Sequence, residues 1–300
     1  MELSTNKQQL HGPIEPIEEK AVSPWLEAWR SFRKNKLAVI GTLIVLFFIL
    51  IAIFAPLIAP EGINEQKYDK TLLAPSSEYW FGTDDFGRDI FSRVVYGARI
   101  SLWVGFISVA GSIIVGCLLG ILAGYYGKWV DTIISRFFDI LLAFPSILLA
   151  IAIVAVLGPS LRNALIAIAV INIPNFGRLI RSRVLSVKQE EYILAARGVG
   201  MKNSRILFHH VLPNSIAPII VQGTLAIATA IIEAAALGFL GLGAEAPNPE
   251  WGKMLADART LLTQAPWTMF FPGLAIMLAV LGFNLMGDGL RDALDPRMKN

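Results

Sequence analysis

The feature that most constrains this chain is a series of apolar runs, each long enough to cross a lipid bilayer. A membrane core about 30 Å thick requires about 20 predominantly apolar residues per helix. The backbone inside lipid must satisfy its own hydrogen bonds, and runs of this length do so as helices. The runs, some interrupted by proline or polar residues, are 37–59, 100–123, 133–157, 161–180, 215–242 and 267–286. We therefore expect an all-α membrane protein with about six transmembrane helices.

The composition agrees with lipid as the surrounding solvent. Hydrophobic residues make up 55% of the chain and charged residues only 16%, whereas soluble domains are about 25% charged. The single cysteine, Cys117, excludes a disulfide within the chain and a cysteine-based metal site. The N-terminus does not have the layout of a cleaved secretory signal, so we expect the first apolar run to be retained as a span.

The distribution of charge predicts which side of the membrane each loop faces. Lysine and arginine accumulate in cytoplasmic loops, and three segments of this chain are rich in them: 30–36, 178–205 and 291–299. The loop at 61–99 has more acidic than basic residues, and so does the loop at 245–259. An even number of spans places both termini on the same side, so charge and parity agree on cytoplasmic termini.

These observations divide the chain into three parts. We expect a cytoplasmic tail with an interfacial helix at 1–36, a transmembrane domain at 37–290 and a cytoplasmic tail at 291–300. The transmembrane domain contains an extracytoplasmic loop at 61–99 and a cytoplasmic loop at 181–213.

Two amphipathic stretches precede spans. Aromatic residues at 25–32 are spaced three and four apart beside basic residues, a pattern typical of a helix lying in the membrane interface. A similar apolar stripe at 86–95 predicts a second interfacial helix, with Thr83 or Asp84 as its cap. Membrane anchoring is the expected role of both.

Small residues recur at every fourth position of two spans. Such spacing lines one helix face and lets neighbouring backbones approach closely, so we expect both spans inside the bundle. These residues are Ser112, Gly116, Gly120 and Gly124 in the second span, and Ala226, Ala230, Ala234 and Gly238 in the fifth.

The chain has no motif for nucleotide binding or catalysis. The nearest fragment of a phosphate loop, Gly127-Lys128, is followed by Trp129 rather than serine or threonine. The three acidic residues at 84–89 lack the spacing of a calcium loop. We therefore expect no cofactor in this chain and no ATP hydrolysis by it alone.

Two acidic residues lie within spans, where ionisable groups are costly and are functional candidates by default. Asp139 is near the start of its span and close to Arg136, so we expect an interfacial ion pair. Glu233 is nearer the middle of the fifth span. It either lines a polar translocation path or accepts hydrogen bonds from a neighbouring helix, and the sequence leaves both interpretations open.

The basic segment between the fourth and fifth spans has a helical pattern outside the membrane. Helix-forming residues are followed by Gly198 and Gly200, which permit a turn. We expect Asn203 to cap a second helix that exposes apolar residues and stops at Pro213. A short helix with exposed apolar residues requires a partner, and we expect a cytoplasmic protein.

This segment resembles the EAA loop of bacterial ABC importer permeases. The family pattern is Glu-Ala-Ala, three residues, Gly, nine residues, Ile, one residue and Leu-Pro. The positions that match are Ala195, Ala196, Gly200, Leu212 and Pro213. Leu194 stands where the family has Glu, and His210 stands where it has Ile.

Further stretches are similar to the second permease subunit of peptide importers, and the resemblance extends from about Trp25 to the C-terminus. These stretches are 80–93, 96–102, 237–243, 249–252 and 287–296. The relatives include dipeptide and oligopeptide permease C subunits and their glutathione and nickel counterparts.

The resemblance implies the fold, partners and location of the protein. It implies a type I ABC importer permease with a cytoplasmic coupling helix, in a bacterial or archaeal plasma membrane. The implied partners are a second homologous permease, two cytoplasmic ATPase subunits that bind ATP and magnesium, and an extracytoplasmic binding protein, with no nucleic acid. The residues implied at the ATPase contact are Ala195, Ala196, Arg197, Gly200, Arg205, Phe208, Leu212 and Pro213.

The implied substrate is a di- or oligopeptide, with glutathione or a nickel chelate as alternatives. Two other classes of protein fit less well. An ion-driven secondary transporter would have paired intramembrane charges or inverted repeats with broken helices, and the sequence shows neither clearly. A membrane-embedded enzyme would need polar groups converging within the spans, for which Asp139 and Glu233 are the only candidates.

Overall fold

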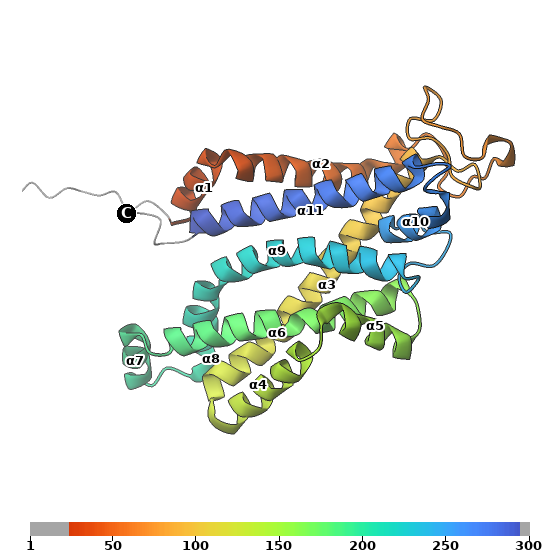
Figure 1. Ribbon diagram of the computed structural model, residues 1–300. Helices are drawn as coiled ribbons and strands as arrows, with labels where there is room; N and C mark the ends of the chain where they lie inside the picture. The colour runs from red at the N-terminus through yellow and green to blue at the C-terminus, as the bar shows by residue number, and fades with distance from the viewer. Residues whose placement is uncertain (1–23, 295–300) are drawn as a thin grey trace, which may run out of the picture.

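The computed structural model describes residues 24–294 as a bundle of long helices (Figure 1). In this part of the chain, five helices are long and apolar enough to cross a membrane, and there are six spans if the bent pair α4 and α5 counts as one. The five are α2 (Lys36–Ile58), α3 (Ile90–Tyr126), α6 (Leu161–Val187), α9 (Leu212–Phe239) and α11 (Trp267–Leu294). The prediction of an all-helical membrane protein with about six spans is confirmed.

The third predicted span is not one straight helix. It consists of α4 (Lys128–Leu142) and α5 (Ser146–Leu157), which are bent by 93° relative to each other. Pro145 lies at the break, where its ring fixes φ and disfavours a helical conformation in the residue before it. Residues 133–157 therefore form parts of two helices with a sharp bend between them rather than one straight helix.

Close contact between α3 and α6 forms the centre of the bundle. A Cβ atom on Gly116 would lie 2.7 Å from the Ile173 carbonyl oxygen, and one on Gly120 would lie 2.4 Å from that of Gly177. The small residues predicted to face the interior of the bundle are buried on both α3 and α9. The prediction that these two spans lie inside the bundle is confirmed.

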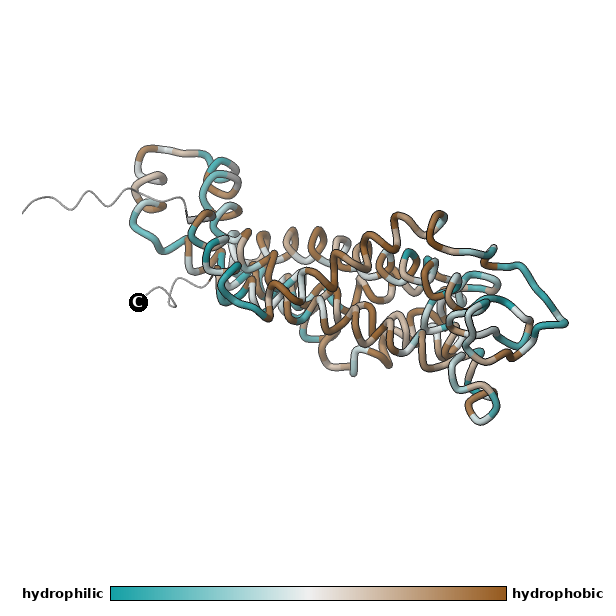
Figure 2. The backbone as a smooth tube through the Cα atoms, turned by 90° about the horizontal axis from the view of Figure 1, so that it is seen from above, coloured by the Kyte–Doolittle hydropathy of each residue, from teal (hydrophilic) through white to brown (hydrophobic). Residues whose placement is uncertain are grey.

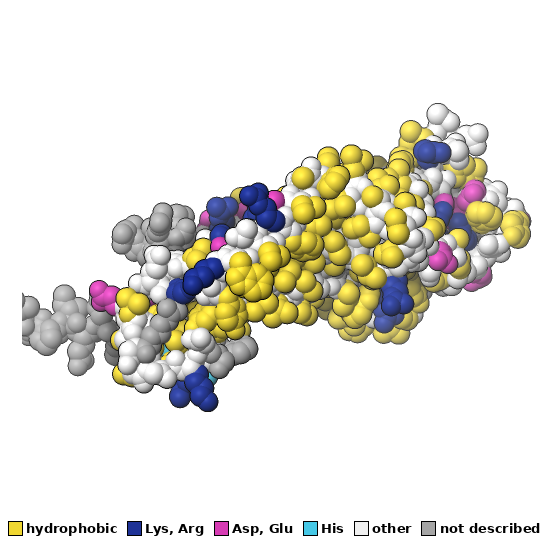
Figure 3. All heavy atoms as spheres, turned by 90° about the horizontal axis from the view of Figure 1, so that it is seen from below, with side chains coloured by type: hydrophobic (Ala, Val, Ile, Leu, Met, Phe, Trp, Pro, Cys, Tyr) yellow, Lys and Arg dark blue, Asp and Glu magenta, His cyan; other side chains and the backbone are white. Residues whose placement is uncertain are grey.

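The molecule has an apolar middle and two polar ends. The hydrophobic colour in Figure 2 is concentrated in the middle of the tube, and hydrophobic side chains cover the middle of the face shown in Figure 3. One end carries α1 (Pro24–Lys34), α7 (Glu191–Gly198) and α8 (Asn203–Ile206). The other carries the loop at 59–89 and α10 (Trp251–Ala258). Short 3-10 turns lie at Tyr68–Lys70 and Arg259–Leu261.

The helix α1 packs partly on protein. Phe32 is 6% exposed and clusters with Ala38 of α2 and Ala293 of α11, whereas Trp29 is 57% exposed. Asn35 then caps α2, because its side-chain oxygen accepts hydrogen bonds from two backbone N–H groups. The side chain of Trp25 lies outside the described residues.

The apolar stripe at 86–95 does not form a separate interfacial helix. Asp89, rather than Thr83 or Asp84, caps α3, and its Oδ2 accepts a hydrogen bond from the Ser92 backbone at 2.8 Å. The helix then runs without a break from Ile90 to Tyr126. The stripe is apolar because Ile90 and its neighbours pack inside the protein. The prediction of a membrane-anchoring interfacial helix at 86–95 is therefore wrong.

Candidate coupling segment and translocation path

The coupling segment, residues 191–213, is anchored to the ends of two long helices. Ile193 of α7 and Ile206 of α8 are almost fully buried and pack with Tyr125 of α3 and Val184 of α6. Lys188, at the end of α6, donates a hydrogen bond from Nζ to the Tyr125 carbonyl at 2.8 Å. Apolar packing and this hydrogen bond tie the segment to the adjoining ends of α3 and α6.

The turn in the coupling segment follows the prediction only in part. Gly200 has φ +78°, a left-handed conformation that favours glycine. Gly198 is the last residue of α7, and Asn203 is the first residue of α8 rather than its cap. The Lys202 carbonyl accepts the first hydrogen bonds of α8.

Pro213 does not stop the second helix of the segment. The chain continues from α8 through a π-helical turn at Leu207–Val211 directly into α9. Pro213 lies in the first turn of α9, where a missing N–H group is tolerated. The coupling segment is therefore helically continuous with a membrane span.

The largest exposed apolar residues of the segment lie in α7 and the turn after it, rather than in the second helix, where they were expected. Ile206 and Val211 are buried, whereas Val199 is 82% exposed, Leu194 56% and Tyr192 45%. Among the other residues predicted at the ATPase contact, Ala195, Arg205 and Pro213 are exposed, Leu212 is half-buried and Ala196 faces inward. The side chains of Arg197 and Phe208 lie outside the described residues. The contact roles of all these residues stay predictions.

The two departures from the family pattern have different surroundings. The ring of His210 packs edge-on against Tyr192 of α7, with ring centroids 5.7 Å apart. Asn214 bridges the same two residues, donating to the Tyr192 hydroxyl at 3.2 Å and to the His210 carbonyl at 2.7 Å. His210 therefore links α7 to the start of α9, whereas Leu194 is surface-exposed.

Glu233 makes a hydrogen bond to a neighbouring helix. It is 8% exposed, and its Oε2 accepts a hydrogen bond from Asn172 Nδ2 of α6 at 3.1 Å. Asn172 also donates to the Ile168 carbonyl at 3.0 Å and accepts from Asn175 Nδ2 at 3.5 Å. The hydrogen-bonding interpretation of Glu233 is therefore supported, and its role in a translocation path stays a prediction.

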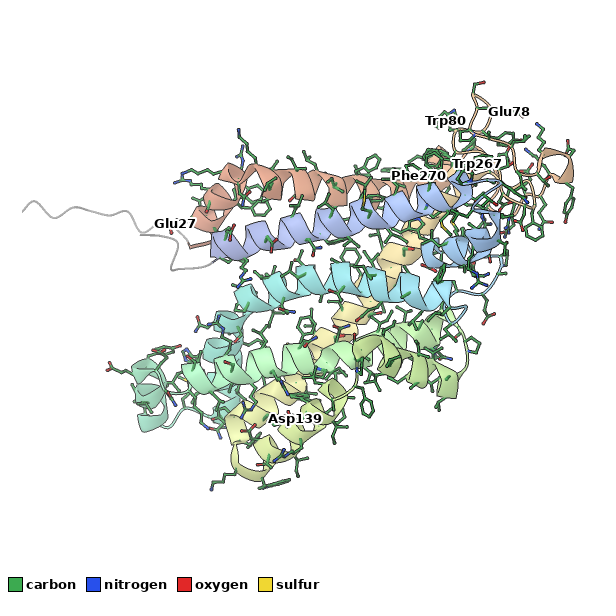
Figure 4. All side chains as sticks on the ribbon, viewed as in Figure 1. Glu27, Glu78, Trp80, Asp139, Trp267 and Phe270 are labelled. Carbon is green, nitrogen blue, oxygen red and sulfur yellow. The ribbon has the colours of Figure 1, made fainter. Side chains whose placement is uncertain are left out.

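Asp139 pairs across helices rather than along its own helix. Its Oδ1 accepts a hydrogen bond from Arg178 Nη2 of α6 at 2.6 Å, whereas Arg136 Nη1 lies 3.8 Å from Oδ2. A second pair, Asp131 with Arg181, joins the same two helices at 2.5 and 2.7 Å. The expected partner, Arg136, is thus the weaker one. Figure 4 labels Asp139 on α4, beside α6.

The opposite polar end holds a buried charged network in the loop before α3. Arg88 Nε donates to Asp84 Oδ2 at 2.7 Å, and both residues are less than 10% exposed. Burial, with a contribution from the charge of Asp84, raises the pKa of the neighbouring Asp85 carboxyl. Within residues 24–294, no group of three or more His, Cys, Asp and Glu side chains is arranged to hold a metal ion.

Comparison with known protein families shows which family the chain belongs to. Residues 116–300 match the family described as "Binding-protein-dependent transport system inner membrane component". Residues 23–75 match the N-terminal transmembrane domain of oligopeptide transport permease C. The chain belongs to this permease family. It is therefore an ABC importer permease and a multi-pass protein of the inner membrane.

Individual permeases are similar over nearly the whole chain. The dipeptide transport system permease protein DppC of Alkalihalophilus pseudofirmus is 66% identical over 280 residues, covering 93% of this chain and 92% of that protein. The di/tripeptide permease DppC of Pseudomonas aeruginosa is 50% identical, covering 93% and 94%. The glutathione permease GsiD of Pectobacterium atrosepticum is 49% identical, covering 95% of each.

A solved structure of the MetNI methionine ABC transporter, in an inward-facing conformation, has a similar fold. The TM-score is 0.55 at 19% sequence identity, and the match covers 69% of this chain and 98% of the solved chain. At this identity the similarity concerns the fold alone, and it identifies the ABC importer permease fold of type I.

Proposed function

We propose that this permease imports di- and oligopeptides, forming half of a translocation path and coupling it to the ATP hydrolysis of partner subunits. The observation that carries the peptide assignment is the 66% identity to a dipeptide permease over 93% of the chain. The glutathione permeases at 49–51% identity make glutathione, itself a tripeptide, the alternative substrate. Nickel chelates are a third candidate substrate, implied by the resemblance to the nickel permeases of the family.

The proposed assembly contains a second homologous permease, two cytoplasmic ATPase subunits and an extracytoplasmic substrate-binding protein. ATP and magnesium bind to the ATPase subunits, and this chain contributes no catalytic group. Two features support the assembly: the family is named for dependence on a binding protein, and the coupling segment exposes large apolar side chains outside the bundle. Exposed apolar surface of this kind favours burial against a protein partner.

The proposed topology places the coupling segment and both termini in the cytoplasm. Basic residues accompany α1, α7, α8 and the end of α6, and all of these lie at the same end of the molecule (Figure 1). The positive-inside rule assigns that end to the cytoplasm and the loop at 59–89 to the opposite side.

Movement of the coupling segment would pass directly to the spans. Ile193 and Ile206 pack against α3 and α6, Lys188 bonds to the end of α3, and the π-helical turn connects α8 to α9 without a loop. ATP binding closes the ATPase pair, displaces the docked segments and thereby shifts the equilibrium between inward-facing and outward-facing arrangements.

Uptake by the complete transporter tests the proposal. The permease pair, ATPases and binding protein are reconstituted in proteoliposomes, and ATP-dependent entry of a labelled dipeptide is measured with unlabelled dipeptides, longer peptides, glutathione or nickel as competitors. We expect dipeptides to compete best, and a non-hydrolysable ATP analogue provides the control. Preferential competition by glutathione would select the alternative substrate, and absence of ATP-dependent peptide uptake would contradict the peptide assignment.

A further inference from the structure

A line of polar side chains follows α6 through the apolar middle of the molecule. Asn172, Asn175 and Arg178 are spaced three residues apart, which places them on one side of the helix. Glu233 of α9 bonds to Asn172 at one end of this line, and Asp139 of α4 bonds to Arg178 at the other. We refer to these five residues as the α6 polar track.

The track reaches the surface of this chain. Asn175 is exposed, and the side chains of Arg178 and Asp139 are 51% and 49% exposed. Glu233 has a second oxygen, Oε1, that makes no hydrogen bond to the described residues and is not fully buried. Amide and charged groups are costly against lipid, so this surface faces a water-filled path or another protein.

The exposed surface elsewhere on the same helices has a different composition. Ile166 of α6 and Ile232 of α9 are 40% and 51% exposed, as expected for side chains in contact with hydrocarbon. The track is therefore a local polar exception on α6 and α9.

The length and charge order of the track fit a short peptide. Six residues of helix separate Asn172 from Arg178, a rise of about 9 Å. An extended peptide spans about 3.3–3.6 Å per residue, so two to three residues cover that distance. The track has a carboxylate at one end and a guanidinium at the other, with two amides between them, and a short peptide carries an ammonium, peptide bonds and a carboxylate in the same sequence.

We propose that the α6 polar track is a binding subsite for the peptide during translocation, an inference that rests on the proposed peptide substrate. Glu233 accepts the N-terminal ammonium, Asn172 and Asn175 bond to the peptide backbone, and Arg178 contacts the C-terminal carboxylate. Arg178 exchanges Asp139 for the substrate carboxylate. Asp139 then keeps Arg136, whose Nη1 lies 3.8 Å from its Oδ2, so neither carboxylate is left without a cation.

Thiol accessibility in the complete transporter tests whether the track faces water. Asn175→Cys is introduced with Cys117→Ala, which removes the only native cysteine, and reaction with a positively charged methanethiosulfonate is timed in proteoliposomes. Only the thiolate reacts, and a thiol against lipid or packed protein rarely ionises. We expect Asn175→Cys to react at least tenfold faster than the control Ile166→Cys, and dipeptide with its binding protein to slow the reaction. Equal rates at the two positions, or no protection by dipeptide, would overturn the proposal.

Charge removal at Glu233 tests recognition of the ammonium group. Glu233→Gln keeps an oxygen that can accept the Asn172 hydrogen bond, so the variant removes charge with little change in shape. We expect dipeptide uptake per ATP hydrolysed to fall at least tenfold, with partial recovery in Glu233→Asp. Normal uptake per ATP by Glu233→Gln would rule out the ammonium contact. An equal fall in uptake and ATP hydrolysis would also count against it, because uptake per ATP is then unchanged and only the overall rate of the transport cycle has fallen.

The two proposals fail in different ways. If the parent transporter shows no ATP-dependent dipeptide uptake, the proposed function is wrong. If the parent transports dipeptides but Asn175→Cys reacts no faster than Ile166→Cys, only the subsite is wrong, and the track is then a packed contact with the second permease.

Discussion

The two polar ends of the molecule are built in opposite ways. At the end that carries α10, charged and aromatic residues are buried within this chain: Trp251 is 0% exposed, and Arg88 and Asp84 are both below 10%. At the coupling end, Leu194 of α7 and Val199 in the turn after it are exposed. The first end packs these charged and aromatic residues against its own chain, whereas the second exposes apolar surface that favours burial against a partner.

This difference predicts where substitutions act. Substitutions of buried residues at the end that carries α10 should reduce the stability of the isolated subunit, because contacts within the chain are lost. Changes at the coupling end should leave stability nearly intact and reduce transport, because the missing contacts lie in another protein. The predictions below test this contrast, from the largest expected change in stability to the smallest.

Trp251→Ala should destabilise the subunit most, by about 3–5 kcal/mol. The indole packs edge-on against Phe48, and its Nε1 donates to the Val94 carbonyl at 3.0 Å. The measurement is thermal unfolding in detergent. Trp80→Ala is the matched control, since Trp80 lies at the same end but is 62% exposed (Figure 4). Similar losses for both variants would contradict the contrast between buried and open surface.

Asp84→Ala should cost about 3 kcal/mol, because it leaves the buried Arg88 guanidinium without its main partner. Asp69→Ala, which removes an exposed carboxylate from the same loop, should change stability little. Unfolding of the Asp84→Ala, Arg88→Ala and double variants gives the coupling between them. A double variant as destabilised as the sum of the single variants would mean that the pair does not interact.

Gly200→Ala should cost about 1–2 kcal/mol locally, because φ +78° is unfavourable for a residue with a Cβ atom. Added atoms meet nothing within 4 Å, so backbone strain is the only expected cost. Gly198→Ala is the matched control, because it lies in helical backbone and also faces open space. Amide hydrogen exchange across 191–206 should accelerate only in Gly200→Ala, and acceleration in both variants would refute the strain argument.

Val199→Asp should change stability by less than about 0.5 kcal/mol and still abolish most ATP-dependent uptake. Val199 is 82% exposed in the turn after α7, so the charge disrupts only a surface that binds a partner. Val199→Thr keeps the shape without the charge and should transport normally. Normal uptake by Val199→Asp would remove this turn from the ATPase contact.

Much of the fold followed from the sequence because membrane spans depend on local composition. The spans were located from runs of apolar residues, and small residues at every fourth position correctly predicted that α3 and α9 lie inside the bundle. The break at Pro145 was missed because a window of hydropathy does not report the direction of a helix. The stripe at 86–95 was misassigned because burial in protein and burial in lipid select the same apolar residues.

The candidate site could be predicted from the sequence only where local residue types determine the structure. The glycine turn at Gly200 and the helix before it follow from local residue types. The pairing of Asp139 with Arg178 could not be anticipated, since 39 residues separate them and both lie on helices whose neighbours were unknown. The same limit applied to Glu233 and Asn172, which are 61 residues apart.

The sequence by itself determined that this chain is a membrane protein with about six spans and which segments carry charge, because the hydrophobic effect and the cost of burying charge act on each segment separately. Tertiary structure alone decided which polar side chains meet inside the bundle. Such contacts depend on the rotation and spacing of packed helices, and those are set by close approach at residues such as Gly116 and Gly120. The α6 polar track exists only because that packing brings α4, α6 and α9 together.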